Sequence, residues 1–407
     1  MTNWSATANA ILFHSSFVDS SFVISNMNAW QAIVLISVGL VGHVILWTAL
    51  VNRIHGLGIS RRIVDSLTLA CGFALLVIPI AILWNARGPS GWQLGNVSIV
   101  YLTLGAILAV YSALVRWWLN REDRNQCLLR DNRTQVLDLR ATHGAKLLAS
   151  GVVRALGSLP GNEVLLVHVH DKQLLVPNLP KELNGLRIAH LSDLHMSGRL
   201  AAEYYEVVVA SVNAWQPDLV AITGDIVEQA EWIERAGEIL GRLRAASGVY
   251  FVLGNHDRKT DHDQIRRELV AVGQIDVGGR SVELTLRGAQ VLIAGNELPW
   301  FPMHQEISRD SAGLRLLLAH GPDQFAWAQK RGFHLMLAGH NHGGQVCFPL
   351  IGAIVAPSVS GTRYAGGLFQ QGDTLLHVSR GTGSLSPLRW NCPPEIALLT
   401  LRTANEH

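Results

Sequence analysis

The chain has 407 residues, a mean hydropathy of +0.23 and 16% charged residues, so it is too apolar for an ordinary soluble protein and long enough for two units. Its formal net charge of +2 gives no electrostatic case for nucleic acid as a partner. Its four cysteines lack a paired or metal-finger spacing, which argues against a disulfide framework and predicts reduced thiols.

Hydrophobic residues gather in the first 120 residues, in three stretches that each approach the roughly 20 apolar residues needed to cross a bilayer. Tryptophans near the stretch ends favour this interpretation, because their rings prefer the headgroup layer. The segment Met1–Asn28 has no Lys or Arg, which argues against a cleaved signal peptide. We therefore predict a membrane domain over residues 1–120, with helices at about Trp30–Val51, Val64–Trp84 and Val97–Leu119.

Arginines are distributed unequally around these stretches. The loop after the first stretch and the exit of the third are rich in Arg, whereas the intervening loop has only Arg87. The positive-inside rule therefore predicts a multi-pass protein of the inner (cytoplasmic) membrane with its C-terminal part on the cytoplasmic side. His43 and Asp65 lie within the stretches, and we interpret them as structural rather than as a proton relay. The arginines concerned are Arg53, Arg61, Arg62, Arg116, Arg121 and Arg124.

Residues 121–163 are mixed and moderately charged, which predicts a linker or membrane-surface segment with a helical stretch around Ala145–Leu156. Strand and helix patterns then alternate up to Val272, and closely spaced strands follow, so residues 164–407 are predicted to form an α/β domain. The predicted strands are Arg187–Leu191, Leu219–Thr223, Val249–Leu253, Val282–Leu286, Val291–Ala294, Leu314–Ala319, His334–Ala338, Thr374–Ser379 and Ile396–Leu401, and the predicted helices are Ala201–Trp215, Glu231–Ala246, Asp263–Val272 and Phe325–Arg331.

Five of these strands end in side chains that can bind a metal. The carboxyl ends of strands in α/β sheets converge, so we expect these side chains to meet. On an extended segment residues i and i+2 point the same way, so Asp193 and His195 would reach one cation. A glycine directly before Asp225, Asn255 and His340 lets the backbone approach an ion closely. The full set is Asp193, His195, Asp225, Asn255, His320, His340 and His342.

The mixture of carboxylate, amide and imidazole groups suits divalent transition metals such as Mn, Fe or Zn. Seven ligands are too many for one tetrahedral catalytic site, but they suit two ions that share a bridging carboxylate. The sequence therefore predicts two divalent transition-metal ions as cofactors.

The blocks D-x-H, G-D, G-N-H-D, H and G-H-x-H occur in this order within Asp193–His342. This set resembles the calcineurin-like metallophosphoesterase family, and the strings GLRIAHLSDLH, LAHGPD, LAGHNHGGQV and SRGTGS look like its bacterial membrane-associated YaeI and YkuE type. The resemblance implies an α/β/β/α sandwich behind the transmembrane helices, and a hydrolase acting on phosphoric ester or diphosphate bonds.

The same resemblance implies roles for single residues. Asp225 would bridge the two ions, and His256 would stabilise charge or act as a general acid, with Asp257 orienting its ring. The first ion would be held by Asp193, His195 and His342, and the second by Asn255, His320 and His340.

Several charged residues and histidines outside the set of predicted ligands have less specific sequence signals. Arg258 directly follows the G-N-H-D block, so we expect it to bind substrate phosphate, whereas Lys259, Arg380 and Arg389 suit a solvated surface at least equally well. Asp323 is expected to fix a loop through backbone N–H groups. The histidines left as structural or surface residues are His168, His170, His190, His262, His334 and His377.

The segment Gly295–Met303 is apolar and contains prolines. It would form a lip over the site or against the bilayer, which motivates a lipid substrate, or it is a plain loop packed on the core. Membrane tethering favours a phospholipid or a lipid-linked diphosphate such as UDP-2,3-diacylglucosamine, because confinement raises the substrate's effective concentration. The alternatives are a phosphodiesterase or phosphomonoesterase acting on soluble substrates, a non-catalytic sensor with a degenerate domain, and a small transporter.

Overall fold

A computed structural model of the chain describes residues 28–88, 91–92, 94–124, 128–304, 307, 313–349 and 351–403. The chain divides into two compact units, one made of residues 1–46 and 73–113 and the other of residues 47–72 and 114–407. Most of the polar N-terminal segment lies outside the described residues, as does Cys127. The other three cysteines are free thiols, as predicted: Cys71, Cys347 and Cys392.

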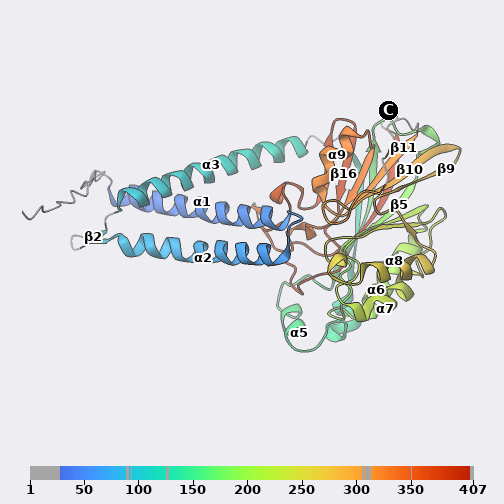
Figure 1. The fold of residues 1–407 in the computed structure, drawn as a ribbon, viewed down its shortest axis with the longest axis horizontal. Coiled ribbons are helices and arrows are strands. Elements are labelled where there is room, and N and C mark those ends of the chain that lie inside the picture. Colours follow the sequence, from blue (N-terminus) through green and yellow to red (C-terminus); the bar gives the residue numbers. More distant parts are fainter. Residues whose placement is uncertain are drawn as a thin grey trace, which may run out of the picture. The chain divides into compact units, whose positions relative to one another are not determined.

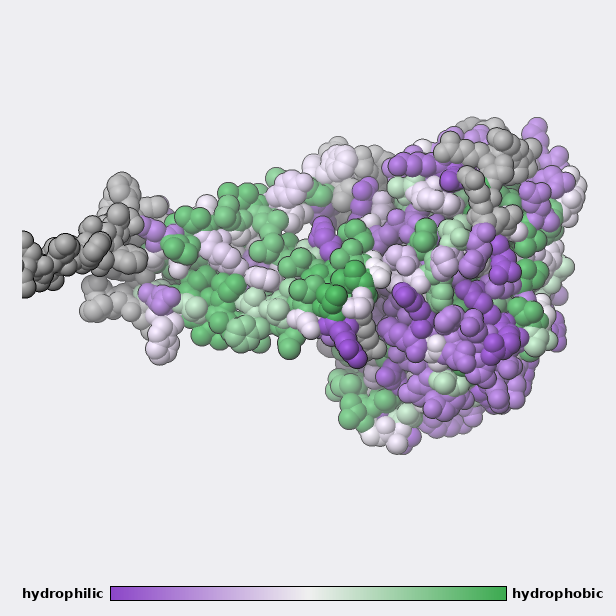
Figure 2. All heavy atoms as spheres, in the orientation of Figure 1, coloured by the Kyte–Doolittle hydropathy of each residue, from purple (hydrophilic) through white to green (hydrophobic). Residues whose placement is uncertain are grey.

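Three long helices account for the apolar N-terminal region (Figure 1). Each is long and apolar enough to span a membrane, and at most 17% of its most apolar window is buried. Hydrophobic side chains accordingly gather on their outer surface (Figure 2). The three predicted stretches are thus confirmed as helices α1 (Ala29–His55), α2 (Arg61–Asn85) and α3 (Asn96–Arg124), with the short strands β1 (Arg87–Gly88) and β2 (Gly91–Trp92) between α2 and α3.

Within the first unit, α1 and α3 approach closely through glycine, and the buried polar group is satisfied. A Cβ on Gly42 would overlap the backbone of Gly105. His43 Nδ1 lies 2.6 Å from Tyr101 Oη, and His43 Nε2 lies 3.0 Å from Leu75 O. Small residues at helix contacts and internally bonded polar groups are typical of helices in lipid. These contacts fit the structural interpretation of His43.

The larger of two main sheets has seven strands in the order β3-β4-β17-β5-β6-β7-β8. Strands β5 to β8 run parallel, and β17 pairs parallel with β4 and antiparallel with β5. The bounds are β3 (Leu129–Asp138), β4 (Leu166–Val176), β5 (Arg187–Leu191), β6 (Leu219–Thr223), β7 (Val249–Val252), β8 (Ile275–Asp276) and β17 (Glu395–Thr403).

The second sheet has six strands in the order β15-β16-β12-β11-β10-β9. Its four central strands are parallel, and an antiparallel strand closes each edge. The bounds are β9 (Ser281–Leu286), β10 (Ala289–Asn296), β11 (Leu314–Ala319), β12 (Leu335–Ala338), β15 (Gly367–Gln371) and β16 (Thr374–Val378).

The two sheets pack face to face, and one hydrophobic core lies between them. A second core joins the larger sheet to α6 (Ala202–Trp215), α7 (Ile233–Leu240) and α8 (His262–Ala271), which lie side by side in Figure 1. A third joins the smaller sheet to α9 (Phe325–Lys330). The predicted α/β/β/α sandwich is therefore confirmed.

The remaining elements are short and connect these layers. They are α4 (Leu139–His143), α5 (Val152–Gly157), β13 (Cys347–Phe348), β14 (Gly352–Ala353), and the 3-10 turns η1 (Gly144–Leu147), η2 (Lys181–Leu183), η3 (Ala230–Trp232), η4 (Asp257–Lys259), η5 (Pro322–Gln324), η6 (His342–Gly344) and η7 (Gly361–Tyr364).

The structure differs from the predicted elements mainly at residues 121–163. There β3 forms a ten-residue edge strand of the larger sheet, paired antiparallel with β4, where the sequence indicated only a linker. Its side chains are mostly exposed, so the strand lacks the apolar alternation that sequence patterns detect. The helix predicted over Glu231–Ala246 also ends early, at Leu240.

Candidate metal centre

The seven predicted ligands follow strands that share one edge of the sandwich. They come directly after β5, β6 and β7 of the larger sheet and after β11 and β12 of the smaller one. The parallel strands of each sheet bring their carboxyl ends together there. Asn255 is half-buried, and the other six, Asp193, His195, Asp225, His320, His340 and His342, are buried.

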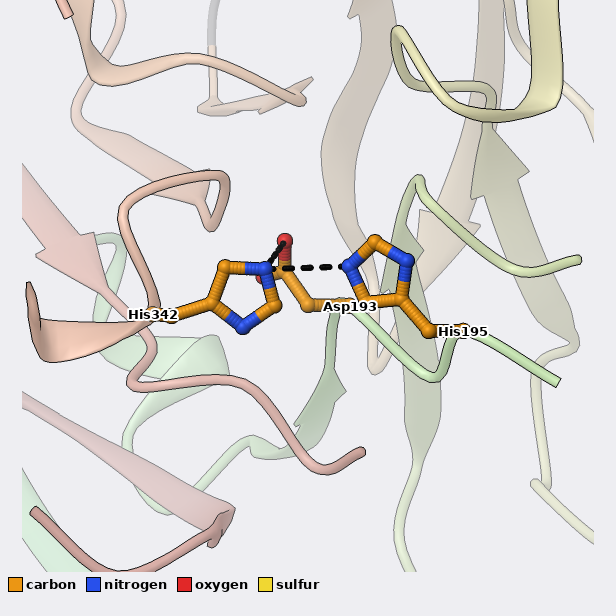
Figure 3. A group of neighbouring side chains, drawn as sticks. All are labelled: Asp193, His195 and His342. Carbon is orange, nitrogen blue, oxygen red and sulfur yellow. Dashed lines mark hydrogen bonds and ion pairs between the residues drawn. The ribbon is translucent and has the colours of Figure 1, made fainter. Parts of the chain in front are cut away.

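Two groups of three ligands form around this edge. Asp193, His195 and His342 make one group, and Asp225, His320 and His340 the other; in each group the three ligand atoms lie within 4.8 Å of one another. In the first group His195 Nε2 lies 3.0 Å from His342 Nε2, which lies 3.4 Å from Asp193 Oδ1 (Figure 3). Buried carboxylate oxygens and imidazole nitrogens at this spacing fit a divalent transition-metal ion.

Asp225 lies between the two groups. Its Oδ2 is 3.6 Å from His195 Nε2 of the first group and 3.3 Å from His320 Nε2 of its own. Asn255 Oδ1 lies 3.1 Å from His320 Nε2, so the amide joins the second group. The structure thus brings all seven predicted ligands together, with one carboxylate placed between two sets of donors.

Three imidazole rings are fixed by a second contact on the nitrogen that faces away from the cluster. His195 Nδ1 lies 3.1 Å from Glu228 Oε2, and His320 Nδ1 donates to the carbonyl oxygen of Thr223 at 2.8 Å. His340 Nε2 donates to the Pro357 carbonyl oxygen at 2.5 Å. Such outer contacts set the tautomer and the orientation of metal-binding histidines, leaving His195 Nε2, His320 Nε2 and His340 Nδ1 toward the cluster.

The backbone at five predicted ligands lies in the left-handed region: Asp193 (φ 53°), His195 (φ 47°), Asp225 (φ 52°), His340 (φ 72°) and His342 (φ 51°). The expectation that Asp193 and His195 share one side of an extended segment is therefore wrong in mechanism, although the side chains do meet. They meet because the chain turns sharply once the ladder of β5 has ended. Each non-glycine residue in this region costs about 1–3 kcal/mol, a strain that clusters at functional sites.

The glycines before the ligands allow the close approach that was predicted. Gly224 has φ +86°, and a Cβ on Gly254 would overlap Asp225 Oδ1. A Cβ on Gly339 would overlap Ser192 Oγ and Asp193 Oδ2. Gly343 and Gly344 also have positive φ, and a Cβ there would meet Cys392 Sγ and Ala353 Cβ respectively.

His256 lies at the edge of the cluster, and its ring is oriented by Glu228. His256 Nδ1 is 2.6 Å from Glu228 Oε2, the oxygen that also contacts His195. Burial would raise the pKa of Glu228, but its bonds to the His195 and His256 rings lower it to about 2. A charged Glu228 thus holds both rings, a role that the sequence did not assign.

Asp257 is the residue expected to orient the His256 ring, but its carboxylate contacts the backbone instead. Oδ1 accepts from the N–H groups of Ile226 and Val227 at 2.8 and 2.9 Å, and Oδ2 accepts from Gly254 N at 2.8 Å. Asp257 therefore ties together the loops that carry Asp225 and Asn255. Burial, followed by the nearby Asp225 charge, raises the pKa of Asp257 to about 7.

The basic residues near the site separate into two kinds. Lys259 Nζ lies 3.1 Å from His256 Nε2, while Arg258 is exposed beside it on η4. Arg389, in contrast, is fully buried, and its guanidinium donates to the carbonyl oxygens of His342, Arg380 and Gly383. Arg389 is thus a clamp on the loop of His342, and the surface interpretation does not hold for it.

The apolar segment Gly295–Met303 was expected to form either a lip over the site or a loop packed on the core, and its residues differ in this respect. The Trp300 ring packs against His320 and His340, with ring centroids 5.2 and 4.9 Å apart, so this residue covers one side of the cluster. Phe301 is buried in the core beneath the larger sheet. Trp300 therefore agrees with the lip, although it also packs against the core, and Phe301 agrees with the packed loop.

Asp323 fixes a loop, as predicted. Its carboxylate accepts from Val359 N and Ser360 N, each at 2.9 Å, and from the hydroxyl groups of Ser358 and Ser360. His190 and His377 lie deep between the sheets and away from the ligand groups, which agrees with their structural interpretation.

Comparison with known proteins identifies the same part of the chain that carries the predicted ligands. The model of the calcineurin-like phosphoesterase family matches residues 186–344. The chain is 31% identical to the uncharacterized metallophosphoesterase YkuE of Bacillus subtilis, over 56% of this chain and 82% of that protein. It is 31% identical to the phosphodiesterase YaeI of Escherichia coli, over 53% of this chain and 82% of that protein. A more distant relative is the UDP-2,3-diacylglucosamine pyrophosphatase LpxG of Chlamydia trachomatis, 25% identical over 54% of this chain and 86% of that protein.

Proposed function

The chain belongs to the calcineurin-like phosphoesterase family and is a metal-dependent phosphoesterase; from this premise we propose that it hydrolyses a phosphorylated membrane lipid at the cytoplasmic face of the inner membrane. The observation that carries the hydrolytic chemistry is Asp225, a buried carboxylate between two groups of metal-binding side chains. In this proposal Asp193, His195 and His342 hold one divalent ion, Asn255, His320 and His340 hold a second, and Asp225 bridges them.

When bound by these residues, two divalent ions would supply charge neutralisation for phosphate oxygens and would activate water for hydrolysis. His256 stands next to the ligands and donates a proton, or a hydrogen bond, to the leaving oxygen. Glu228 keeps the His256 ring in place, because its charged carboxylate contacts Nδ1, while Lys259 Nζ lies 3.1 Å from Nε2. In this proposal the leaving oxygen of the substrate displaces the Lys259 contact at Nε2. Lys259 contacts the His256 ring and Arg258 is exposed next to it in the chain, and in this proposal both offer positive charge to the phosphate. Asp257 acts as a positioning residue through the backbone.

The lipid class of the substrate is supported by three observations. Three apolar helices precede the enzyme domain, so a membrane substrate is confined near the site. The Trp300 ring offers an apolar surface beside His320 and His340. The relative LpxG is named for a lipid-linked diphosphate substrate, UDP-2,3-diacylglucosamine, which we propose as one candidate here. The arginine distribution supports the cytoplasmic side.

The hydrolytic activity is tested with the purified full-length protein, Mn²⁺ and bis-p-nitrophenyl phosphate. We expect hydrolysis that a chelator abolishes and that Asp225→Asn lowers by about 10²–10³-fold, because the shared carboxylate is lost. Asp263→Asn, an exposed carboxylate on α8, is the matched control and should behave as wild type. An Asp225→Asn protein as active as the control would contradict the proposed site.

The substrate class is tested by comparing lipid extracts of cells that carry wild-type protein or Asn255→Ala. We expect a phospholipid or nucleotide-linked lipid to accumulate with Asn255→Ala. If only soluble phosphoesters accumulate, the alternative of a phosphodiesterase or phosphomonoesterase on soluble substrates replaces the lipid proposal, while the two-metal site stands.

A further inference from the structure

A group of exposed apolar side chains lies on the segment between β13 and η7. Ile351, Val355 and Val359 are 53%, 55% and 46% exposed. We refer to residues 351–360 as the rim segment. Three exposed apolar side chains within nine residues of a short segment favour an interaction surface, because single exposed apolar residues are common whereas groups of them are not.

The rim segment is attached to the ends of the apolar helices inside the second unit. The side chain of Asn52 on α1 makes two hydrogen bonds to the backbone of the rim segment. Nδ2 donates to Ile354 O at 3.0 Å, and Oδ1 accepts from Ala356 N at 3.1 Å. The Arg116 guanidinium of α3 donates to the carbonyl oxygen of Ile351. A Cβ on Gly56, which follows α1, would overlap Val359 N, so the two backbones lie in direct contact.

These attachments set the depth of the rim segment relative to a bilayer. α1 has 27 residues, about 40 Å at 1.5 Å per residue, which exceeds the hydrocarbon core of about 30 Å and nearly matches the full bilayer with its headgroups. Asn52 lies three residues before the end of α1, about 4.5 Å along the axis. The backbone that Asn52 binds therefore lies at the level of the headgroup layer.

The loop between α1 and α2 extends the same surface. Leu57 and Ile59 are 45% and 43% exposed, and they flank Gly58, which packs against Pro299 of the apolar segment next to Trp300. The α1–α2 loop thus lies against the segment that carries Trp300, the residue that covers His320 and His340.

The rim segment is also joined to the metal centre. Its Pro357 carbonyl oxygen accepts the hydrogen bond that fixes the His340 ring, and Asp323, three residues after His320, holds the backbone of Val359 and Ser360. The same ten residues therefore contact a membrane helix at one side and a predicted metal ligand at the other.

We propose that the rim segment and the α1–α2 loop form a membrane-seated entrance to the metal centre. Ile351, Val355 and Val359 lie in the interfacial layer of the bilayer that α1–α3 cross, and the phosphorylated headgroup of a membrane amphiphile passes over them while its acyl chains stay in lipid. The occupant of this surface is the bilayer, because Asn52 and Arg116, which bind the rim segment, belong to α1 and α3, and each of these helices is apolar enough to span a membrane. The entrance role rests on the proposed function, whereas the seating in lipid does not.

The seating is tested with the full-length protein in nanodiscs that contain radiolabelled phosphatidylglycerol. The photoreactive residue p-benzoylphenylalanine replaces Val355, or in a matched control Val270, which is 51% exposed on α8 of the same unit. We expect lipid crosslinking at position 355 to exceed that at position 270 at least several-fold. Equal crosslinking at the two positions would overturn the seating, whether or not the protein is an active enzyme.

The entrance role is tested with Val355→Asp, because a carboxylate in the interfacial layer opposes both lipid and an anionic headgroup. We expect turnover of a phospholipid substrate in the nanodisc to fall about tenfold relative to bis-p-nitrophenyl phosphate, with Val270→Asp leaving both rates unchanged. An equal loss on both substrates, or no loss on either, would overturn the entrance role. Absence of hydrolysis by the wild-type protein would instead refute the proposed function, and the crosslinking result would still decide the seating.

Discussion

Apolar side chains face outward on the three helices and inward in the sandwich. Leu69 of α2 and Val97 of α3 are 76% and 84% exposed, whereas Leu318 of β11 and Val378 of β16 are fully buried. The outward apolar side chains of the helices suit a lipid surrounding, whereas the inward ones of the sandwich suit a domain surrounded by water. The two regions also differ in the kind of polar group that they bury, and this difference shows how each is stabilised.

In the helices a buried polar side chain, His43, lies within hydrogen-bond distance of a tyrosine hydroxyl and a backbone carbonyl oxygen. In the sandwich the buried polar group is a charged pair. Lys172 Nζ lies 2.6 Å from Glu395 Oε1 and 3.0 Å from His377 Nε2, between the two sheets. Burial would raise the pKa of Glu395, but the Lys172 charge holds it well below its usual range. Removing either partner of this pair would therefore leave an uncompensated charge buried in the sandwich.

The largest effect is expected from Lys172→Met. Removing one partner leaves the Glu395 carboxylate, 1% exposed, without its cation, which should lower the free energy of unfolding of the sandwich by about 3–5 kcal/mol. Thermal or denaturant unfolding of the detergent-solubilised protein measures the loss. The double variant Lys172→Met/Glu395→Gln should recover part of it.

The matched control for this prediction is Arg133→Met, which breaks the exposed pair between Arg133 and Asp131 on β3. Exposed pairs contribute about 0–1 kcal/mol, so this variant should be near wild type. A loss for Lys172→Met no greater than that for Arg133→Met would show that the buried pair does not stabilise the larger sheet.

The next effect is expected from the metal ions. A ligand that binds only the folded state stabilises it by about 2.7 kcal/mol at one hundred times its dissociation constant. Adding Mn²⁺ to chelator-treated protein should therefore raise the unfolding temperature of the sandwich, because the predicted ligands lie there. The Asp225→Asn protein should show much less of this rise. An identical rise in both proteins would place the bound metal elsewhere.

A smaller effect is expected from Glu228→Gln, which keeps the shape of the side chain but removes the charge between His195 and His256. Loss of a partner that orients a metal ligand or a reacting group typically costs about 10–100-fold, so kcat on bis-p-nitrophenyl phosphate should fall by this factor. The pH dependence of kcat should shift as well, because the charge next to the His256 ring is lost. A change in stability alone, with an unaltered pH profile, would reduce Glu228 to a structural role.

The sequence predicted that these seven side chains meet, because each lies in a short block after a strand, together with a glycine or a second predicted ligand. It did not predict Glu228, which has no block of its own; the available signal is its position three residues after Asp225, close to the G-D turn. It did not predict the left-handed backbone at Asp193 and His195, because such a turn depends on where the ladder of β5 ends rather than on local propensity.

Two further features of the fold could not be predicted from the sequence, because local residue patterns carry little information about them. β3 is a polar edge strand that is held mainly by hydrogen bonds to β4, so periodicity carries little information about it. The pairing of Lys172 with Glu395 joins residues 223 positions apart through the neighbouring strands β4 and β17, and only the topology brings them together. Asp323, in contrast, was predicted correctly, since loop-fixing by carboxylates is a local rule.

The smallest effect on the sandwich is expected from a change in the helices. Gly42→Ala adds a methyl group where α1 meets the backbone of Gly105 in α3, and overpacking of this kind costs about 1–3 kcal/mol at the contact. Hydrogen exchange of the protein in nanodiscs should become faster in peptides of α1 and α3 but not in those of the two sheets, and hydrolysis of bis-p-nitrophenyl phosphate should be unchanged. Gly72→Ala on α2 is the control, because a Cβ there meets nothing within 4 Å. If Gly42→Ala also loosens the sheets or slows hydrolysis of the soluble substrate, the two regions do not fold independently, since strain between α1 and α3 then reaches the ligand loops.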